Sequence, residues 1–111
     1  MINTILRGNV YWVNLDPAIG TETKKRRPGL IVSSNVGNIN SSRVIIAPIT
    51  SNVKKVYPFE VLLKNADKPS KVMLDQIRTV DKKRLSGFLF SISNDEMMKV
   101  EQVIKLVLNL K

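Results

Sequence analysis

Six short runs of β-branched, aliphatic and aromatic residues, separated by turn-forming residues, constrain the fold of this chain more than any other feature. Their lengths, and the proline, glycine and asparagine residues between them, are typical of strands joined by short loops. The expected strands span residues 9–15, 29–34, 43–50, 59–63, 71–80 and 87–92. Strands at this spacing predict a small β-barrel or a compact rolled sheet.

Three positions refine this prediction. Residues 18–28 contain four consecutive cations and no apolar period, so we expect an exposed loop there. Pro48 cannot donate a ladder hydrogen bond, which predicts an edge strand or a bulge at that point. Tyr11 and Trp12 are adjacent in a strand and point to opposite faces. At least one of them is therefore expected in the core, although such rings also stack on bases.

The C-terminal residues change to a helical period. Ser93 and Glu96 have the spacing of a capping box. An apolar stripe follows, made of Met97, Val100, Val103, Ile104, Val107 and Leu108. This face must pack on the sheet or on a second subunit. With no repeat or linker in between, we expect one domain over residues 1–111, with the barrel at about 5–92 and the helix at about 95–109.

The charge is concentrated in the strand-rich part of the chain. The 18 Lys and Arg residues exceed the 9 Asp and Glu residues by nine. The formal charges of residues 95–111 sum to zero, so the first 94 residues carry the whole positive excess. The basic residues cluster at 24–27, 54–55 and 82–84. Such an excess favours a polyanionic partner, nucleic acid above all or an acidic protein. A solvated basic surface that aids solubility is the alternative.

The composition excludes several kinds of chemistry. The chain has no cysteine and no histidine, so it has no disulfide, no cysteine nucleophile, no Cys/His zinc site and no histidine acid–base catalysis. Its acidic residues are scattered, which favours metal-independent chemistry without a cofactor. No apolar run approaches the roughly 18 residues of a membrane span, and no signal-peptide pattern is visible. We therefore expect a cytoplasmic protein that does not contact a membrane.

RNA is a substrate that such a chain could cut, because its 2′-hydroxyl is an internal nucleophile. Guanidinium and hydroxyl groups stabilise charge on a phosphate. Arg27, which precedes Pro28, and Thr50, at a strand end, suit this role, but from composition alone a solvated loop and an ordinary strand end are the favoured explanations. Asp75 lies among apolar residues, so it either pairs with a cation such as Arg78 or is functional.

Several segments taken in order resemble the MazF/PemK toxin family. They are Arg7-Gly8-Asn9-Val10-Tyr11-Trp12, Leu15-Asp16-Pro17, Gly20, residues 27–33, Ala47-Pro48-Ile49-Thr50-Ser51 and residues 74–81. The resemblance extends over about residues 3–110. It implies an SH3-like β-barrel with a terminal helix that acts as a homodimer. It also implies a toxin that cuts single-stranded RNA at specific sequences without metal, leaving 2′,3′-cyclic phosphate and 5′-hydroxyl ends. An acidic antitoxin would wrap the dimer and block the RNA groove.

The resemblance also assigns site residues. Arg27 corresponds to the family's catalytic arginine, in proton transfer and phosphate stabilisation, and Thr50 to the threonine that holds the scissile phosphate. Asp75 and Arg78 are supporting candidates. The RNA-binding candidates are Thr21, Lys24, Lys25, Arg26, Ser51, Asn52, Lys54, Lys55 and Gln76.

This chain departs from some members at three positions. It has Asn9 where an acid is common, Thr21 where some members have histidine, and Met73 where some have arginine. A His/Arg/Asp arrangement therefore cannot operate here. The role of Asp75, catalytic or structural, stays open at this point. Two rival hypotheses keep the fold: a CcdB-type toxin that poisons DNA gyrase, and a non-catalytic RNA-binding barrel.

Overall fold

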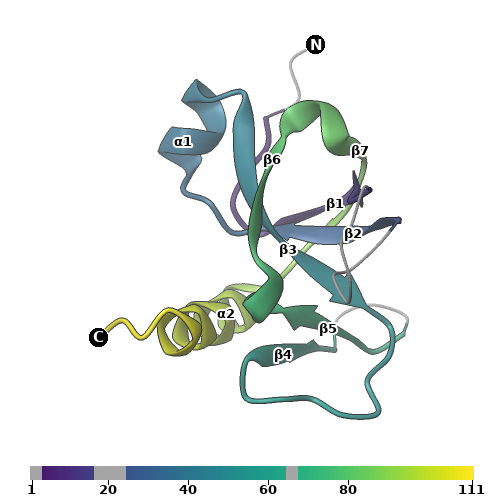
Figure 1. The fold of residues 1–111 in the computed structure, drawn as a ribbon, viewed down its shortest axis with the longest axis vertical. Coiled ribbons are helices and arrows are strands. Elements are labelled where there is room, and N and C mark those ends of the chain that lie inside the picture. The colour runs from purple at the N-terminus through teal and green to yellow at the C-terminus, as the bar shows by residue number, and fades with distance from the viewer. Residues whose placement is uncertain (1–3, 17–24, 65–67) are drawn as a thin grey trace.

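The computed structural model describes residues 4–16, 25–64 and 68–111, which form a curved antiparallel sheet and two helices (Figure 1). The strands are β1 (Asn9–Asn14), β2 (Arg26–Ile31), β3 (Arg43–Thr50), β4 (Glu60–Leu63), β5 (Ser70–Met73), β6 (Arg78–Asp81) and β7 (Leu85–Ser91). The helices are α1 (Asn35–Asn40) and α2 (Asn94–Val107), with two 3₁₀ turns, η1 (Leu74–Gln76) and η2 (Lys82–Arg84).

β3 is the central strand of the sheet. The strand order is β4-β5-β3-β2-β1-β7, and β6 pairs with the first half of β3. The predicted edge strand is therefore wrong, because β3 is flanked on both sides, but the predicted irregularity at Pro48 is present, since the pairing on one side is interrupted there. Pro48 lies opposite Gly29 of β2, between the last β6 pair at Ile46 and the first β5 pair at Ile49. The neighbouring strand changes at this position, so a missing amide donor interrupts no continuous ladder.

Two apolar clusters stabilise the curved sheet. One is built on Val10, Leu30, Val32, Ala47, Ile49, Val61, Leu63, Val72, Leu74 and Val100. The other is built on Tyr11, Val13, Leu15, Ile31, Val44, Ile46 and Val80. Tyr11 belongs to the second cluster, whereas Trp12 is only partly buried. The adjacent aromatic residues thus separate, one into the core and one toward the surface, as predicted.

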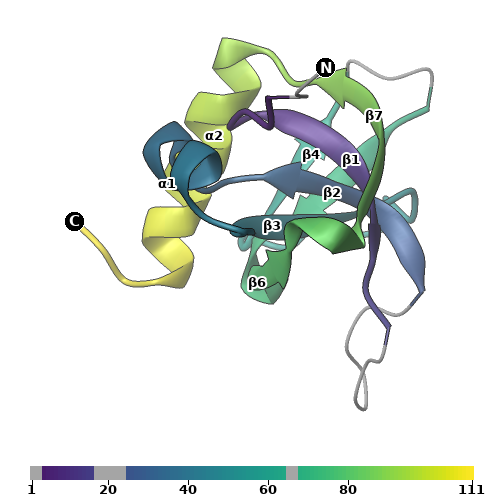
Figure 2. The same ribbon diagram turned by 90° about the horizontal axis from the view of Figure 1, so that it is seen from above.

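Helix α2 packs across β4 and η1, as Figures 1 and 2 show. The predicted capping box is present, with the Ser93 side chain accepting from Glu96 and Glu96 accepting from the Ser93 backbone. Five of the six predicted stripe residues pack on the core, but Leu108 is half exposed. The helix ends at Val107, and the chain then turns at Asn109, whose φ is 57°, so Leu108 leaves the packed face.

The largest differences from the predicted elements lie at three places. β2 begins at Arg26, inside the basic run predicted as loop, because β1 supplies a ladder partner as far as Asn14. Residues 35–40 form a helix in a stretch predicted only to end a strand; Ser34 caps it by accepting from the Gly37 amide. The predicted strand 71–80 is split by η1, where Val72, Met73 and Leu74 are all buried instead of alternating.

Candidate functional site

A groove of about 590 Å³ brings the two predicted catalytic residues together. It is formed at the ends of β1, β2 and β3, beside the residues that lead into β5. Its lining consists of Trp12, Lys25, Arg26, Arg27, Pro28, Ile49, Thr50, Ser51, Lys68, Pro69, Ser70 and Phe90. The lining thus combines cations and hydroxyl groups with apolar side chains, a combination suited to phosphates and bases.

Strand register explains why Arg27 and Thr50 meet. In the β2–β3 ladder Gly29 pairs with Pro48 and Leu30 with Ala47. The ladder ends at Gly29 and Pro48, and extending its register by two residues brings Arg27 level with Thr50. Side chains of directly opposed residues project from the same face of an antiparallel sheet. Residues 23 positions apart in the sequence thereby come together on adjacent strands, and both line the groove.

The hydroxyl of Thr50 is oriented by the chain that follows it. Its Oγ1 accepts a hydrogen bond from the Asn52 amide at 3.2 Å, and Asn52 Oδ1 accepts from the Lys54 amide at 3.3 Å. A threonine hydroxyl has a donor hydrogen as well as acceptor lone pairs. Thr50 can therefore accept from Asn52 and donate to a phosphate oxygen at the same time.

The cations at the start of β2 are held in place by local contacts. The Arg26 guanidinium lies 4.8 Å from the centroid of the Trp12 ring. Lys25 has a φ of 67°, a left-handed conformation that is strained for a residue with a side chain. Its amide donates to Asp16 Oδ1 at 2.8 Å, and its carbonyl accepts from the Leu15 amide at 2.9 Å. These contacts fix the entry of the basic segment into the groove.

The structure places the other predicted residues unevenly. Lys25, Arg26 and Ser51 line the groove, and Asn52, Lys54 and Lys55 lie in the exposed segment that follows it. Gln76, Asp75 and Arg78 lie in or after η1 and are not among the residues that line the groove. Thr21 and Lys24 lie outside the described residues.

Of the two alternatives for Asp75, the pairing with Arg78 is not formed. Within the described residues the ion pairs are Arg7–Glu101 and Lys71–Glu60. Arg78 instead donates to the Leu15 carbonyl at 3.4 Å, and Asp75 is exposed. Asp75 lies in the 3₁₀ turn η1, whereas Arg78 begins β6, where it pairs with Ile46 of β3.

Several groove residues were missed by the sequence analysis. Lys68 and Ser70 line the groove from the segment that leads into β5. Lys68 is an isolated cation outside the charge clusters, and only the pairing of β5 with β3 brings it near Thr50. Among the described residues, no three acidic side chains gather closely enough to hold a metal ion.

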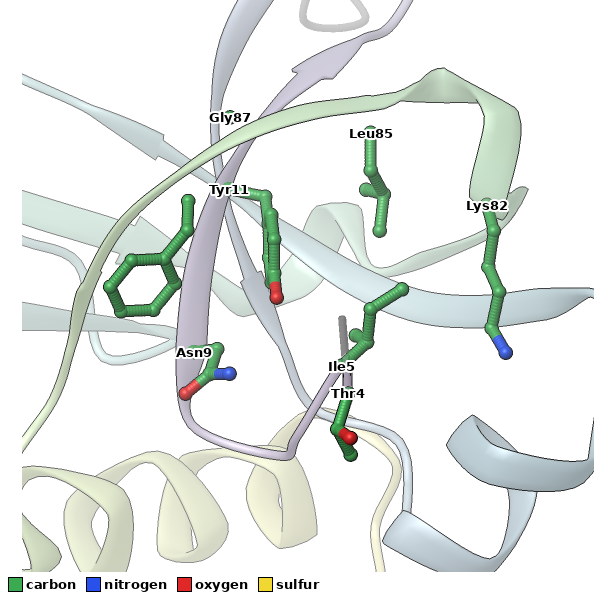
Figure 3. Close-up of a pocket in the computed structure, with 8 residues that line it drawn as sticks. Thr4, Ile5, Asn9, Tyr11, Lys82, Leu85 and Gly87 are labelled. Atoms are coloured by element: carbon green, nitrogen blue, oxygen red, sulfur yellow. The ribbon is translucent and has the colours of Figure 1, made fainter. Parts of the chain in front are cut away.

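A second pocket of about 550 Å³ lies between β1 and the N-terminal part of β7 (Figure 3). Its lining consists of Thr4, Ile5, Asn9, Tyr11, Lys82, Leu85, Gly87 and Phe88. It shares no residue with the groove and contains none of the predicted site residues. The groove of Arg27 and Thr50 is therefore the candidate site.

Comparison with protein families shows which family this chain belongs to. Residues 6–108 match the model of the PemK-like, MazF-like toxins of type II toxin–antitoxin systems. The chain belongs to this family. The predicted PemK/MazF family is thus confirmed, and so is a mainly antiparallel β fold with a C-terminal helix.

Individual PemK/MazF relatives match over nearly their whole length. Endoribonuclease MazF9 of Mycobacterium tuberculosis is 34% identical over 113 residues, covering 94% of this chain and 96% of the relative. The crystal structure of MazF from Deinococcus radiodurans superposes with a TM-score of 0.87 at 28% identity, covering 98% of this chain and all of that one. This chain is therefore a homologue of MazF endoribonucleases.

A further solved relative was crystallised with its partner. It is an endoribonuclease from a mycobacterial species in complex with its cognate antitoxin, with a TM-score of 0.82 and 27% identity. The match covers 96% of this chain and 97% of that one.

Within the described residues of this chain, neither α1 nor α2 has the length and apolar composition of a membrane-crossing helix.

Proposed function

We propose that this chain is the toxin of a toxin–antitoxin pair and cleaves single-stranded RNA, messenger RNA in the cytoplasm, at specific sequences without a metal ion. The observation that carries the proposal is the groove that Arg27 and Thr50 line together from the adjacent strands β2 and β3. Relatives named endoribonucleases, which match over nearly the whole chain, support it.

The chemistry needs no group beyond those of the groove and the substrate. The RNA 2′-oxygen attacks the adjacent phosphorus, and the bond from phosphorus to the 5′-oxygen breaks. The products are a 2′,3′-cyclic phosphate and a 5′-hydroxyl, so one proton leaves the nucleophile and one reaches the leaving oxygen. Arg27 takes part in this proton transfer and stabilises the charge on the phosphate through its guanidinium fork. The Thr50 hydroxyl donates to a phosphate oxygen and keeps it in line.

The remaining cations attract and align the RNA strand. Lys25, Arg26 and Lys68 lie around the same groove and interact with phosphates on either side of the scissile one. The partly exposed Trp12, with Arg26 over its ring, offers a stacking surface for a base. Sequence specificity arises from base contacts in this groove, whereas the lysines contribute affinity for any single strand.

We further propose that the curved sheet is an SH3-like barrel and that two copies form a homodimer. α1 and α2 lie toward the side of the molecule from which the C-terminus projects (Figures 1 and 2). They expose large apolar side chains there, including Val36 at 74%, Ile39 at 63% and Leu106 at 61%. Exposed apolar residues of this size favour burial against a second subunit.

The cognate antitoxin is proposed to be an acidic peptide that occupies the basic groove. The net charge of +9 gives such a peptide a long-range attraction, and the same cations that hold phosphates would hold its carboxylates. Antitoxin binding and RNA binding are then mutually exclusive, so added antitoxin should raise the RNA concentration needed for half-maximal cleavage.

The experiment that tests the function is a digest of a long RNA in EDTA, with the cut ends mapped. We expect discrete cuts in single-stranded regions, each leaving a 5′-hydroxyl end. Replacing the single 2′-hydroxyl at a mapped cut site by hydrogen should abolish cleavage at that site alone, because it removes the nucleophile. RNA that stays intact in the presence of folded protein would reject the ribonuclease and favour a gyrase poison or an RNA-binding barrel.

A further inference from the structure

A buried ion pair holds the segment that joins β3 to β4. Lys71 Nζ lies 2.9 Å from Glu60 Oε1, and their side chains are only 10% and 6% exposed. Lys71 Nζ also donates to the Lys55 carbonyl at 2.7 Å, and Glu60 Oε1 accepts from the Tyr57 amide at 2.9 Å. The Glu60 amide donates to the Tyr57 carbonyl at 2.9 Å. These contacts fix the backbone of the segment on both sides of Tyr57.

The ring of Tyr57 is held in place yet remains exposed. It stacks on Phe59 with the two planes 3° apart and the centroids 5.2 Å apart. Lys71 Nζ lies 5.6 Å from its centroid. Even so, Tyr57 is 45% exposed. A rigid aromatic ring with an accessible surface needs little further ordering to stack on another planar group.

Strand register connects the segment that carries this ring to Thr50, one of the residues that line the groove. Thr50 pairs with Lys71, and Lys71 pairs with Leu62 on its other side. Opposed residues share a face of the sheet, so the face that presents Thr50 continues over Lys71 to β4 and the segment that Lys71 anchors. Two strand spacings amount to about 10 Å. The exposed Lys54 and Lys55 precede Tyr57 and supply positive charge for the backbone of a strand that passes over it.

We propose that Tyr57 is a base-stacking residue that extends the RNA groove beyond Thr50. Its ring stacks on the base of a nucleotide that flanks the scissile phosphate, while Lys54 and Lys55 hold neighbouring phosphates. This inference rests on the proposed function for the identity of the ligand. A nucleic-acid strand fits the surface better than an acidic peptide, because the surface offers a planar ring as well as cations.

A binding cycle between protein and RNA variants tests the proposal. The probe is a short single-stranded RNA that contains a mapped cut site, with the 2′-hydroxyl removed there so that it binds without being cut. In a series of such RNAs, one flanking nucleotide at a time lacks its base. Wild-type protein should lose about tenfold in affinity at one particular abasic position, as expected for one stacked base.

The variants decide whether Tyr57 causes that loss. Tyr57→Ala should bind intact RNA about tenfold more weakly and lose nothing further at the same abasic position. Tyr57→Phe, which keeps the ring, should behave as wild type, and so should Val56→Ala, a change at an exposed neighbour. Tyr57→Leu replaces the ring by another apolar side chain and should bind as Tyr57→Ala does, and a wild-type Tm in both variants excludes misfolding as the cause.

Two results would overturn the inference. One is additive loss, in which Tyr57→Ala remains as sensitive as wild type to every abasic position. The other is unchanged RNA affinity together with weakened binding of the antitoxin, which would make Tyr57 a protein contact. Either result is separate from a failure of the ribonuclease, because that failure appears as intact all-ribose RNA with wild-type protein.

Discussion

Replacing Lys71 by methionine tests whether a buried charge pair holds the segment beside the groove. The variant leaves Glu60, which is 6% exposed, without its cation 2.9 Å away, and it removes the donor to the Lys55 carbonyl. Removing one partner of a buried pair costs about 3–5 kcal/mol, mostly because an unpaired charge remains in a poorly solvated position. Since both side chains retain some solvent contact, we expect the lower value, about 3 kcal/mol.

Urea unfolding and thermal unfolding measure this loss directly. For a chain of this length, 3 kcal/mol corresponds to a fall in Tm of roughly 12 °C. All variants must be compared at one protein concentration, because the proposed dimerisation would make Tm depend on concentration. In the double variant Lys71→Met/Glu60→Gln no charge is left unpaired, and the glutamine oxygen still accepts from the Tyr57 amide. We therefore expect the double variant to be more stable than Lys71→Met alone.

The reasoning would be refuted by a Lys71→Met variant that loses less than about 1 kcal/mol, the range of an exposed ion pair. It would also be refuted if the double variant Lys71→Met/Glu60→Gln were less stable than Lys71→Met alone. Lys105→Met is the matched control. This lysine lies on the exposed face of α2 and takes part in no ion pair of the described residues, so its replacement should leave Tm within about 2 °C.

Four further predictions follow from the structure. Thr50→Val, which keeps the shape but loses the hydroxyl, should lower the cleavage rate about 100-fold or more, whereas Thr50→Ser should retain most activity in a single-turnover assay. Gly29→Ala should destabilise by about 1–3 kcal/mol, because the added Cβ would lie 2.7 Å from Val13 Cγ2; unchanged urea unfolding would contradict this. Leu106→Lys should shift a dimer toward monomer in sedimentation at micromolar concentration. RNA binding that engages about four phosphates should weaken with salt at a log–log slope near −3; a flat dependence would reject the interaction.

The sequence predicts those elements of the fold whose determinants are local. The strand at 43–50 has the predicted boundaries, and the capping box of α2 is present because Ser93 and Glu96 satisfy it without help from the rest of the fold. The start of β2, in contrast, is determined by another strand. Arg26, Arg27 and Pro28 have no strand pattern of their own and become strand only through pairing with β1. The six residues of α1 are too few for a helical period to be recognised.

The candidate site shows the same division. Arg27 and Thr50 come from the resemblance to a family, and the register of two strands then explains how they meet. The Glu60–Lys71 pair depends on the pairing of β4 with β5, which neither residue reveals in its own segment. Asp75 was placed wrongly in a continuous strand, because its apolar neighbours suit a buried 3₁₀ turn as well as they suit a strand.

Single-turnover cleavage of a mapped RNA in EDTA by Arg27→Ala and Arg26→Ala tests the central claim most directly. The two variants remove the same charge from adjacent positions of one strand and one groove. We predict that Arg27→Ala lowers the rate of the chemical step at least 100-fold with little change in Tm. Arg26→Ala should mainly weaken binding and leave the rate at saturating RNA close to wild type. Equal rates for Arg27→Ala and wild type at saturation, or equal losses in the two variants, would contradict the assignment of Arg27 as the catalytic arginine.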